Sequence, residues 1–469
     1  MKVKDFGQVF TPINIVRDVL DAAGYKGENI LKKHVIDNSC GDGAFLIEII
    51  DRYIKSFKKK NKNLDGVEKE IEKYIHGIEM DSEIHQACID NLNNFIENNN
   101  LKKIKFDILC EDTLKTDKYD KKMDFVVGNP PYVRVHNLND QYTELKKYSF
   151  CESGMTDLYI AFYEVGLKML NKNGILCYIT PNSFYNSLAG NKLRSYICES
   201  QTMELIMDVG HYQPFNVTTY TTICKIANGS KFGTCKYYKY DIETGRPEYI
   251  CDIKYEDLFV DGNIILSSDN SKFYPILTYT PSCKSKVQVK NGFATLNDKI
   301  FIQKEFPFSE NQIDVIKGST GEWKKCIYPY DENGKLIPFD KLGKKVQKYF
   351  NDNKTELIKD DKKVDSYWYA FGRTQAINDV KHKKYAINTT IKDIKSIRIN
   401  KVDSGKGMYS CLYMLTDISE KQLKDIICTD KFIEYLQILN KCKSGGYFTF
   451  SSKDLSKFVN SSLEVENND

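Results

Sequence analysis

Short apolar runs alternate with longer amphipathic runs through the first half of the chain, and this alternation limits the fold more than any other feature. A strand-like run at 74–78, for example, is followed by a helical pattern at 82–98. Strands separated by helices form parallel, doubly wound sheets whose ligand sites lie at the carboxyl ends of the strands. We therefore predict an α/β fold. The expected strands are residues 34–37, 74–78, 105–109, 123–127, 174–179, 204–209 and 220–226.

The pattern changes after residue 228, where strand-like runs become shorter and richer in Lys and Tyr. A chain of 469 residues exceeds one ordinary hydrophobic core, so we expect two domains, residues 1–230 and 231–469. The first holds 29 Lys and Arg against 31 Asp and Glu, and the second holds 39 against 33. The more basic second half suits a module that meets a polyanion.

Composition excludes several classes of protein. No apolar run approaches the roughly 20 residues that span a bilayer, and the first residues do not resemble a secretory signal, so we expect no membrane and a cytoplasmic location. The 14 cysteines contain no Cys-x-x-Cys pair, and no His-Glu-x-x-His pattern occurs. We expect reduced thiols and no metal.

Polar segments follow the expected strands in a consistent order. The first, Asp37-Asn-Ser-Cys-Gly-Asp-Gly43, has glycines that permit a tight turn and a close ligand, although a dinucleotide fingerprint would have a third glycine. The second contains Glu79, whose carboxylate suits a ribose diol, and Asp81, which also suits a helix cap. In the third, Asp112 is placed to accept from an adenine amine, or simply forms a polar turn.

The fourth segment is Asn129-Pro130-Pro131-Tyr132, directly after an apolar strand. Two prolines hold the backbone rigid, so its carbonyls project in fixed directions. The Asn129 side-chain oxygen and the Pro130 carbonyl can both accept hydrogen bonds from one amino group. Tyr132 adds a flat face for stacking. The segment therefore suits recognition of a planar group that carries an amine.

Together these segments resemble the gamma-arranged, TaqI-like adenine-N6 DNA methyltransferases of restriction–modification systems. The resemblance covers about residues 7–228. It implies a Rossmann-like S-adenosylmethionine methyltransferase sheet, mostly parallel with one antiparallel strand, followed by a C-terminal mixed α/β target-recognition domain. It also implies S-adenosylmethionine as cofactor and double-stranded DNA as partner, with a monomer and a separate cognate endonuclease as further expectations.

The resemblance assigns roles to individual residues. Asn129, Pro130 and Tyr132 would be catalytic, and Tyr132 and Phe215 would stack on a flipped target base, with Tyr212 and Tyr220 as alternatives to Phe215. Cys40, Asp42 and Thr113 depart from the family's usual residues. The implied cofactor-binding residues are Thr11, Asp37, Ser39, Gly41, Gly43, Glu79, Met80, Asp112, Thr113, Pro131 and Phe162.

Basic residues in the second half are interleaved with aromatic residues. Residues 381–398 hold six Lys and Arg against one Asp, and the aromatic run 367–371 precedes Arg373. This pattern suits phosphate contacts and stacking, although a solvated lysine face has the same composition. The segment 443–450 resembles a glycine-aromatic loop of related enzymes. The candidate DNA-binding residues are Arg373, Lys381, Lys383, Lys384, Lys392, Lys395, Arg398 and Tyr447.

Four other functions stay open. Protein-glutamine methyltransferases share the Asn-Pro-Pro-Tyr motif, but they have an N-terminal helical domain, whereas the extra residues here are C-terminal. An RNA adenine methyltransferase would use the same chemistry. A combined restriction–modification chain needs a metal-binding carboxylate cluster, and no Pro-Asp dipeptide occurs in the sequence. A binding protein without activity is the fourth.

Overall fold

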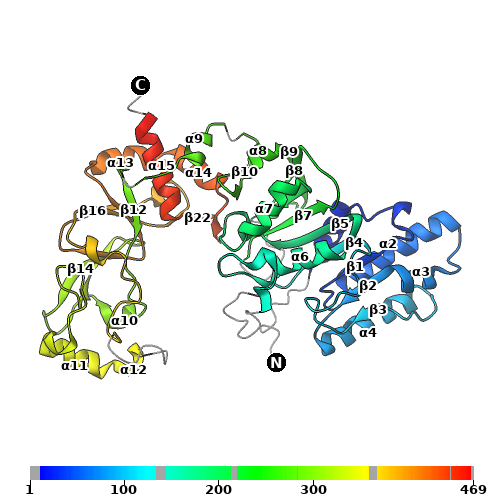
Figure 1. The fold of residues 1–469 in the computed structure, drawn as a ribbon, viewed down its shortest axis with the longest axis horizontal. Helices are drawn as coiled ribbons and strands as arrows, with labels where there is room; N and C mark the ends of the chain where they lie inside the picture. Colours follow the sequence, from blue (N-terminus) through cyan, green and yellow to red (C-terminus); the bar gives the residue numbers. More distant parts are fainter. Residues whose placement is uncertain are drawn as a thin grey trace. The chain divides into compact units, whose positions relative to one another are not determined.

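The chain forms two compact units, Met1–Asn270 and Ser271–Asp469 (Figure 1). The first unit extends beyond the boundary that we expected after residue 230. Two strands, β8 (Thr234–Tyr240) and β9 (Pro247–Lys254), add to the large sheet because β8 pairs with β6 (Met203–Asp208) and β9 pairs with β8. The computed structural model describes residues 11–133, 144–210, 212, 219–269, 271–282, 284–358, 367–443 and 445–465.

A mostly parallel sheet forms the centre of the first unit, as the sequence predicts. Its order within the described residues is β3-β2-β1-β4-β5-β7-β6-β8-β9. The expected antiparallel strand is β7, which runs against β5 and β6, and β9 is a further one, against β8. The remaining strands are β1 (Val35–Asp37), β2 (Ile75–Ile78), β3 (Asp107–Leu109), β4 (Met123–Gly128), β5 (Leu170–Pro181) and β7 (Thr221–Ala227).

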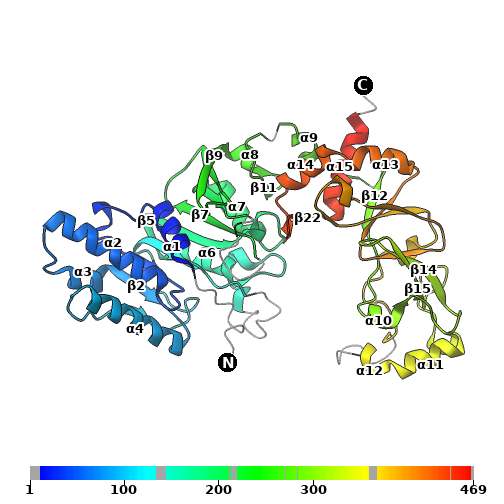
Figure 2. The same ribbon diagram turned by 180° about the vertical axis from the view of Figure 1, so that it is seen from behind.

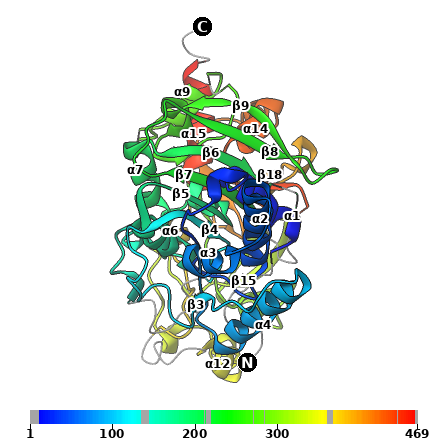
Figure 3. The ribbon, with the colours of Figure 1, turned by 90° about the vertical axis from the view of Figure 1, so that its right-hand side faces the viewer.

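Helices cover both faces of this sheet. Figure 3 shows α6 (Leu158–Met169) and α7 (Asn191–Ser200) on one face, and α1 (Ile13–Ala23) and α2 (Ala44–Asn61) on the other. Each layer buries its own apolar cluster against the strands. The sequence predicts α4 (Ser82–Asn98) with its observed bounds, and Asp81 caps this helix through the backbone N–H groups of Glu83 and Ile84. It does not predict α3 (Val67–Tyr74), which buries only Val67 and Ile71.

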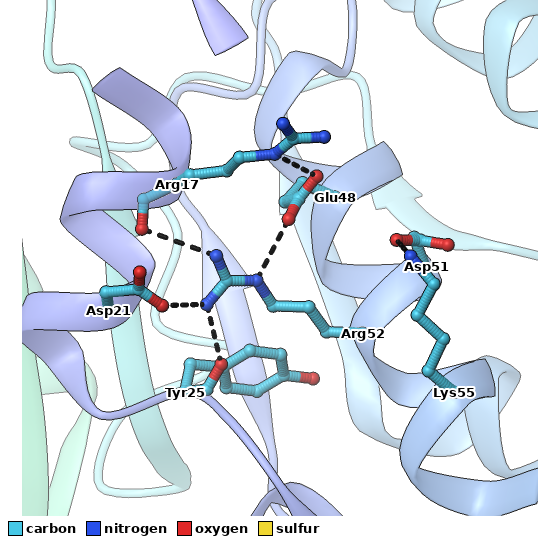
Figure 4. A network of polar contacts seen from close by, with 7 residues as sticks. All are labelled: Arg17, Asp21, Tyr25, Glu48, Asp51, Arg52 and Lys55. Atoms are coloured by element: carbon cyan, nitrogen blue, oxygen red, sulfur yellow. Dashed lines mark hydrogen bonds and ion pairs between the residues drawn. The ribbon is translucent and has the colours of Figure 1, made fainter. Parts of the chain in front are cut away.

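An ion-pair network fastens α1 to α2 (Figure 4). Arg52 on α2 donates to Asp21 on α1 at 2.7 Å and to Glu48 at 3.0 Å. It also donates to the carbonyls of Tyr25 and Arg17 at 3.1 and 3.3 Å, at the end of α1 and within it. Because the Arg52 side chain is only 14% exposed, little water competes with these bonds.

The second unit is built from small sheets and short helices (Figure 2). One sheet has the order β12-β20-β16-β18, a second β13-β15-β14-β19 and a third β17-β22-β21. Figure 2 shows α11 (Lys344–Asp352) and α12 (Lys354–Leu357) at one end of this unit, and α13, α14 and α15 at the other. The strands are β12 (Gln288–Asn291), β13 (Ile302–Gln303), β14 (Gln312–Lys317), β15 (Glu322–Ile327), β16 (Lys384–Ile387), β17 (Thr390–Ile391), β18 (Ile399–Val402), β19 (Gly407–Tyr409), β20 (Leu412–Leu415), β21 (Cys442–Lys443) and β22 (Tyr447–Thr449).

Aromatic side chains make up much of the core of the second unit. Phe371 lies 4.9 Å from Phe293 and 5.2 Å from Phe301 between ring centres, and all three are buried. No described helix in either unit is long and apolar enough to cross a membrane. The remaining helices of this unit are α9 (Tyr274–Thr278), α10 (Asp298–Phe301), α13 (Glu420–Ile427), α14 (Asp430–Ile438) and α15 (Ser452–Val465).

We expect Arg52→Ala to destabilise the first unit by about 1–3 kcal/mol, because it leaves Asp21 and Glu48 without their shared, poorly hydrated partner. Arg17→Ala is the matched control. Arg17 is 58% exposed and makes one ion pair with Glu48, so its loss should change stability by less than about 1 kcal/mol. Urea unfolding of both variants measures the difference. Equal effects would show that Arg52 does not fasten the two helices.

Candidate active site

The ends of β1 and β4 meet without an intervening side chain, and this contact places the first and fourth polar segments together. Gly128 ends β4 with a φ of +149°, and a Cβ atom there would lie 2.5 Å from Asp37 Oδ1. Only glycine therefore fits beside Asp37. As a result the Ser39 hydroxyl donates to the carbonyl of Asn129 at 3.3 Å. The glycine loop and the Asn-Pro-Pro-Tyr segment thus share one edge of the sheet.

Glu79 joins the first segment to the second. Its two carboxylate oxygens accept from the N–H groups of Gly41 at 3.1 Å and Asp81 at 2.9 Å. A carboxylate oxygen can accept more than one hydrogen bond. Glu79 is buried, whereas the neighbouring Met80 is half exposed. Met80 therefore offers an apolar surface beside the Glu79 carboxylate. Gly43 turns with a φ of +93°, and a Cβ atom there would lie 2.9 Å from Cys88 Sγ.

Two acidic side chains at this edge of the sheet, Asp37 and Glu79, are buried, and burial opposes their ionisation. Asp37 is buried, and loss of hydration raises its pKa to about 7, although the N–H of Ser39 partly offsets this effect. Burial likewise raises the pKa of Glu79. Nearby positive charge would reverse both shifts because it favours the carboxylate forms. The two acids therefore suit a ligand that has hydroxyl donors and a cationic centre.

The fourth segment is held from two directions. The Asn129 amide nitrogen donates to the hydroxyl of Thr11 at 3.0 Å, just before α1. The Tyr132 hydroxyl donates to the carbonyl of Ile179 in β5 at 3.4 Å, and burial raises the Tyr132 pKa well above its usual value. Tyr132 therefore stays neutral over the physiological range. Pro130 is buried and Pro131 half-buried, so the backbone between these anchors is fixed.

Two of the expected cofactor residues, Thr113 and Phe162, are buried. The Thr113 hydroxyl donates to the carbonyl of Asn38 at 2.5 Å, and both residues are buried. Phe162 is a residue of α6 and belongs to the hydrophobic cluster that this helix buries. Asp112 is half-buried, accepts from the N–H of Leu114 at 3.0 Å and pairs with Lys115 at 3.3 Å. Asp112 therefore keeps a partly exposed carboxylate, whereas the side chains of Thr113 and Phe162 are almost fully buried.

Asn38 is a supporting residue that the sequence did not single out. It is fully buried, its side-chain oxygen accepts from the Tyr178 hydroxyl at 3.0 Å, and its carbonyl accepts from Thr113. It therefore links the glycine loop to β5 and to the loop after β3. Its place directly after β1 could have identified Asn38 in the sequence. A polar residue at the carboxyl end of a strand either faces the ligand or forms buried hydrogen bonds.

Phe215 lies outside the described residues. Its two alternatives are engaged in packing. Tyr212 stacks on Tyr240 with ring centres 5.7 Å apart, and its hydroxyl accepts from the Asn14 amide at 3.0 Å. Tyr220 is buried, and its carbonyl accepts from the N–H of Asn182. Both tyrosines therefore make packing or hydrogen-bond contacts within the first unit.

Lys384 cannot contact DNA, which corrects one expectation for the second unit. Its side chain is buried, and its ammonium group donates to the carbonyls of Asp379, Val380 and His382. Burial lowers its pKa to about 8. Lys384 begins β16, all four residues of which are buried, and a charge count cannot distinguish a buried lysine from an exposed one.

The other candidate DNA-binding residues lie on the surface. Arg398 donates to the carbonyls of Ser319 and Thr320, and the Lys392 ammonium lies 5.9 Å from the ring centre of the partly exposed Tyr447. Arg373, Lys381, Lys383 and Lys395 are also exposed. The sequence did not single out Trp323, whose ring is 42% exposed and lies 5.1 Å from the Lys406 ammonium.

No group of three or more His, Cys, Asp or Glu side chains that could hold a metal ion occurs in the part of the chain that the structure describes. The described cysteines are free thiols. Several of them are buried; burial raises the pKa of Cys177 and Cys224, and a hydrogen bond with Cys88 together with burial raises the pKa of Cys40. Such thiols are poor nucleophiles because the thiolate is disfavoured.

Comparisons with known proteins agree with this fold. Residues 29–215 match the family model described as the Eco57I restriction-modification methylase. The chain is 24% identical over 478 residues to the type II restriction enzyme and methyltransferase RM.Eco57I of Escherichia coli, covering 79% of this chain and 48% of that protein. It is 26% identical over 434 residues to the type II methyltransferase M.BstVI of Geobacillus stearothermophilus, covering 77% and 73% respectively.

A solved structure extends the likeness to the whole fold. The structure of the type IIL restriction-modification enzyme MmeI in complex with DNA has a TM-score of 0.65 and 14% identity, and covers 96% of this chain and 65% of that one. The first unit therefore contains a segment that is similar to the methylases of restriction–modification systems. Residues 29–215 match the model of the Eco57I restriction-modification methylase family, in agreement with the family resemblance found in the sequence. A methylase of this family also agrees with the expected cofactor, S-adenosylmethionine.

We expect Asp37→Asn to remove a pH-dependent loss of stability. The pKa of Asp37 is about 7 in the folded chain, against an ordinary value of 3.8 for an aspartate, so only the unfolded chain releases this proton between pH 4 and 7. Stability therefore falls as pH rises through that window. The free energy of unfolding of the variant minus that of wild type should therefore rise by about 2–3 kcal/mol from pH 5 to pH 8. Urea unfolding at the two pH values measures this change. The exposed Asp90→Asn on α4 is the control and should show no such gain.

Proposed function

We propose that this protein is a DNA methyltransferase that transfers a methyl group from S-adenosylmethionine to N6 of an adenine flipped out of double-stranded DNA. The observation that carries the proposal is the contact between the Ser39 hydroxyl and the carbonyl of Asn129. It joins a loop suited to a cationic ligand with hydroxyl groups to a segment suited to a planar amine. A donor and an acceptor held on one edge of a sheet can react directly, because positioning supplies much of the rate enhancement.

The residues of the first edge fit the proposed cofactor. Glu79 would accept from the ribose hydroxyls, and Met80 would cover the adenine face. Gly41 and Gly43 would let the ligand approach the backbone, and Asp112 would accept from the adenine amine. Asp37, whose pKa is raised by burial, would lie near the positive charge of the ligand, which favours its carboxylate form. When bound, S-adenosylmethionine supplies an electrophilic methyl group on a sulfonium centre.

The residues of the fourth segment would prepare the target amine. The Asn129 side chain and the Pro130 carbonyl would accept its two hydrogens, which draws the nitrogen towards tetrahedral geometry and frees its lone pair from the ring. Tyr132 would stack on the extruded base, a contact worth about 1–3 kcal/mol. Phe215 is proposed as the second stacking residue. The bond between Thr11 and Asn129 would keep the amide correctly oriented while the base enters.

DNA is favoured over the other substrates by the relatives and by the second unit. RM.Eco57I and M.BstVI are both named as type II methyltransferases, and the MmeI structure holds DNA. The second unit adds exposed basic and aromatic side chains, which suit a phosphate backbone. A glutamine side chain would need no such surface. We propose residues 271–469 as the target-recognition unit, and the first unit, Met1–Asn270, as the catalytic one.

We expect Asn129→Ala to lower methylation of DNA by at least about a hundredfold, because the target amine loses the acceptor that reshapes it. Host DNA from cells that express wild-type or variant protein would be mapped for N6-methyladenine. The wild type should mark one short sequence, and the variant should leave it unmarked. The exposed Asn94→Ala on α4 is the matched control and should mark the same sequence.

Either of two results would contradict this assignment. A variant as active as wild type would remove Asn129 from the reaction. Folded wild-type protein that binds S-adenosylmethionine and marks no DNA would direct the search to RNA or to a protein glutamine, tested with tritiated cofactor and those substrates.

We expect Lys383→Ala to weaken DNA binding at low salt and to reduce the dependence of log Kd on log salt concentration by about one unit, because one phosphate contact is lost. Lys384→Met should leave that slope unchanged, since Lys384 donates only inward, to carbonyls. Fluorescence anisotropy between about 50 and 200 mM salt measures both slopes. Equal slopes in wild type and Lys383→Ala would exclude Lys383 from the DNA contact.

A further inference from the structure

Two large apolar side chains stand exposed on neighbouring loops of the first unit. Leu188 is 70% exposed and Met155 is 54% exposed. The loops touch, since a Cβ atom on Gly154 would lie 3.1 Å from Leu188 Cγ and 3.1 Å from the N–H nitrogen of Ala189. Gly154 has a φ of +61°, a conformation that suits glycine. The loop before α6 and the loop before α7 therefore present one joint apolar tip.

This tip lies close to the candidate catalytic segment. The N–H of Leu158 donates to the carbonyl of Val133 at 3.1 Å, and Val133 directly follows Tyr132. Met155 precedes Leu158 by three residues, so its Cα lies within about 11 Å of that bond. The tip and the segment also share a sheet edge, because the loop that carries Leu188 follows the end of β5 at Pro181.

Charged side chains hold both loops rigid. The Lys146 ammonium donates to the carbonyls of Cys151 at 3.1 Å, Glu152 at 3.2 Å and Gly154 at 3.0 Å. In the same way, the buried Arg194 donates to the carbonyls of Phe184 at 2.6 Å and Ser187 at 2.7 Å.

An ion pair of 3.0 Å between Lys192 and Glu152 ties the two loops together. Such bracing prevents Leu188 and Met155 from folding back into the core. A rigid, exposed apolar tip is unfavourable in water, so it suits a surface that arrives from outside.

We propose that Leu188 and Met155 form an apolar wedge that enters the DNA base stack beside the target adenine and fills the space that the flipped base leaves. The proposal rests on the DNA methyltransferase function proposed above. Extruding a base sacrifices its stacking and pairing, and an apolar side chain inserted at the vacated step restores part of that contact. The occupant is DNA because the substrate must reach Tyr132, and the wedge lies beside the path to it.

The test compares two duplexes that contain the methylated sequence found by mapping. In one the target adenine is paired with thymine, and in the other it faces an abasic site, which makes extrusion easier. For Leu188→Ser we expect kcat/KM to fall about tenfold on the paired duplex and less than about threefold on the abasic one. Leu188→Met, which keeps an apolar tip, should restore activity on the paired duplex.

Two further measurements separate a wedge from a folding defect. With 2-aminopurine at the target position, Leu188→Ser should show less fluorescence increase than wild type on binding the paired duplex, because fewer bases are flipped. Thermal melting of Leu188→Ser and Met155→Ser should match wild type. Ile250→Ser, another exposed apolar residue of the same unit, is the control and should keep full activity on both duplexes.

The outcomes are distinct. Unchanged activity of both serine variants on the paired duplex overturns the wedge, and so does an equal loss on both duplexes. A tip that binds a second copy of the chain or another protein would give the first of these results. If wild-type protein methylates neither duplex, the proposed function itself fails. If wild type is active and only the serine variants discriminate between the duplexes, the wedge stands.

Discussion

The contact between β1 and β4 is the constraint on which the site depends. Parallel strands deliver their carboxyl ends to one edge, and Gly128 lets the second strand approach Asp37 without a side chain between them. The Ser39 loop then reaches the Asn129 carbonyl. A larger residue at 128 would separate the glycine loop from the Asn-Pro-Pro-Tyr segment, the two segments that the proposed methyl transfer needs side by side. The sheet itself therefore brings the donor and acceptor sides together.

Buried charged groups have opposite effects on stability in two regions of the first unit. At the edge of the sheet, burial of Asp37 and Glu79 outweighs the hydrogen bonds that they accept, so both pKa values rise and these two acids lower the stability of the folded chain at neutral pH. Between α1 and α2, Arg52 meets its acceptors at short distances and fixes α1. Thr11 directly precedes α1 and accepts a hydrogen bond from Asn129. By fixing α1, the Arg52 network therefore also helps to hold the Asn-Pro-Pro-Tyr segment in place.

The sequence was least informative about surfaces. It grouped Lys383 and Lys384 as DNA-binding residues, but β16 points the second lysine at three carbonyls. It also overlooked Trp323, which lies exposed beside Lys406. A charge count measures what a segment contains, whereas contact with a ligand depends on which face each side chain occupies.

Sequence alone determined the alternating elements, the order of the four polar segments and their places at strand ends, because periodicity and turn residues are local properties. Only the tertiary structure decided which segments touch. The bond between Thr11 and Asn129 spans 118 residues, and the pairing of β6 with β8 moved the unit boundary to Asn270. The joint tip of Leu188 and Met155 likewise exists only once two loops pack. Such contacts follow from how strands pair across the sheet, and no local pattern encodes that pairing.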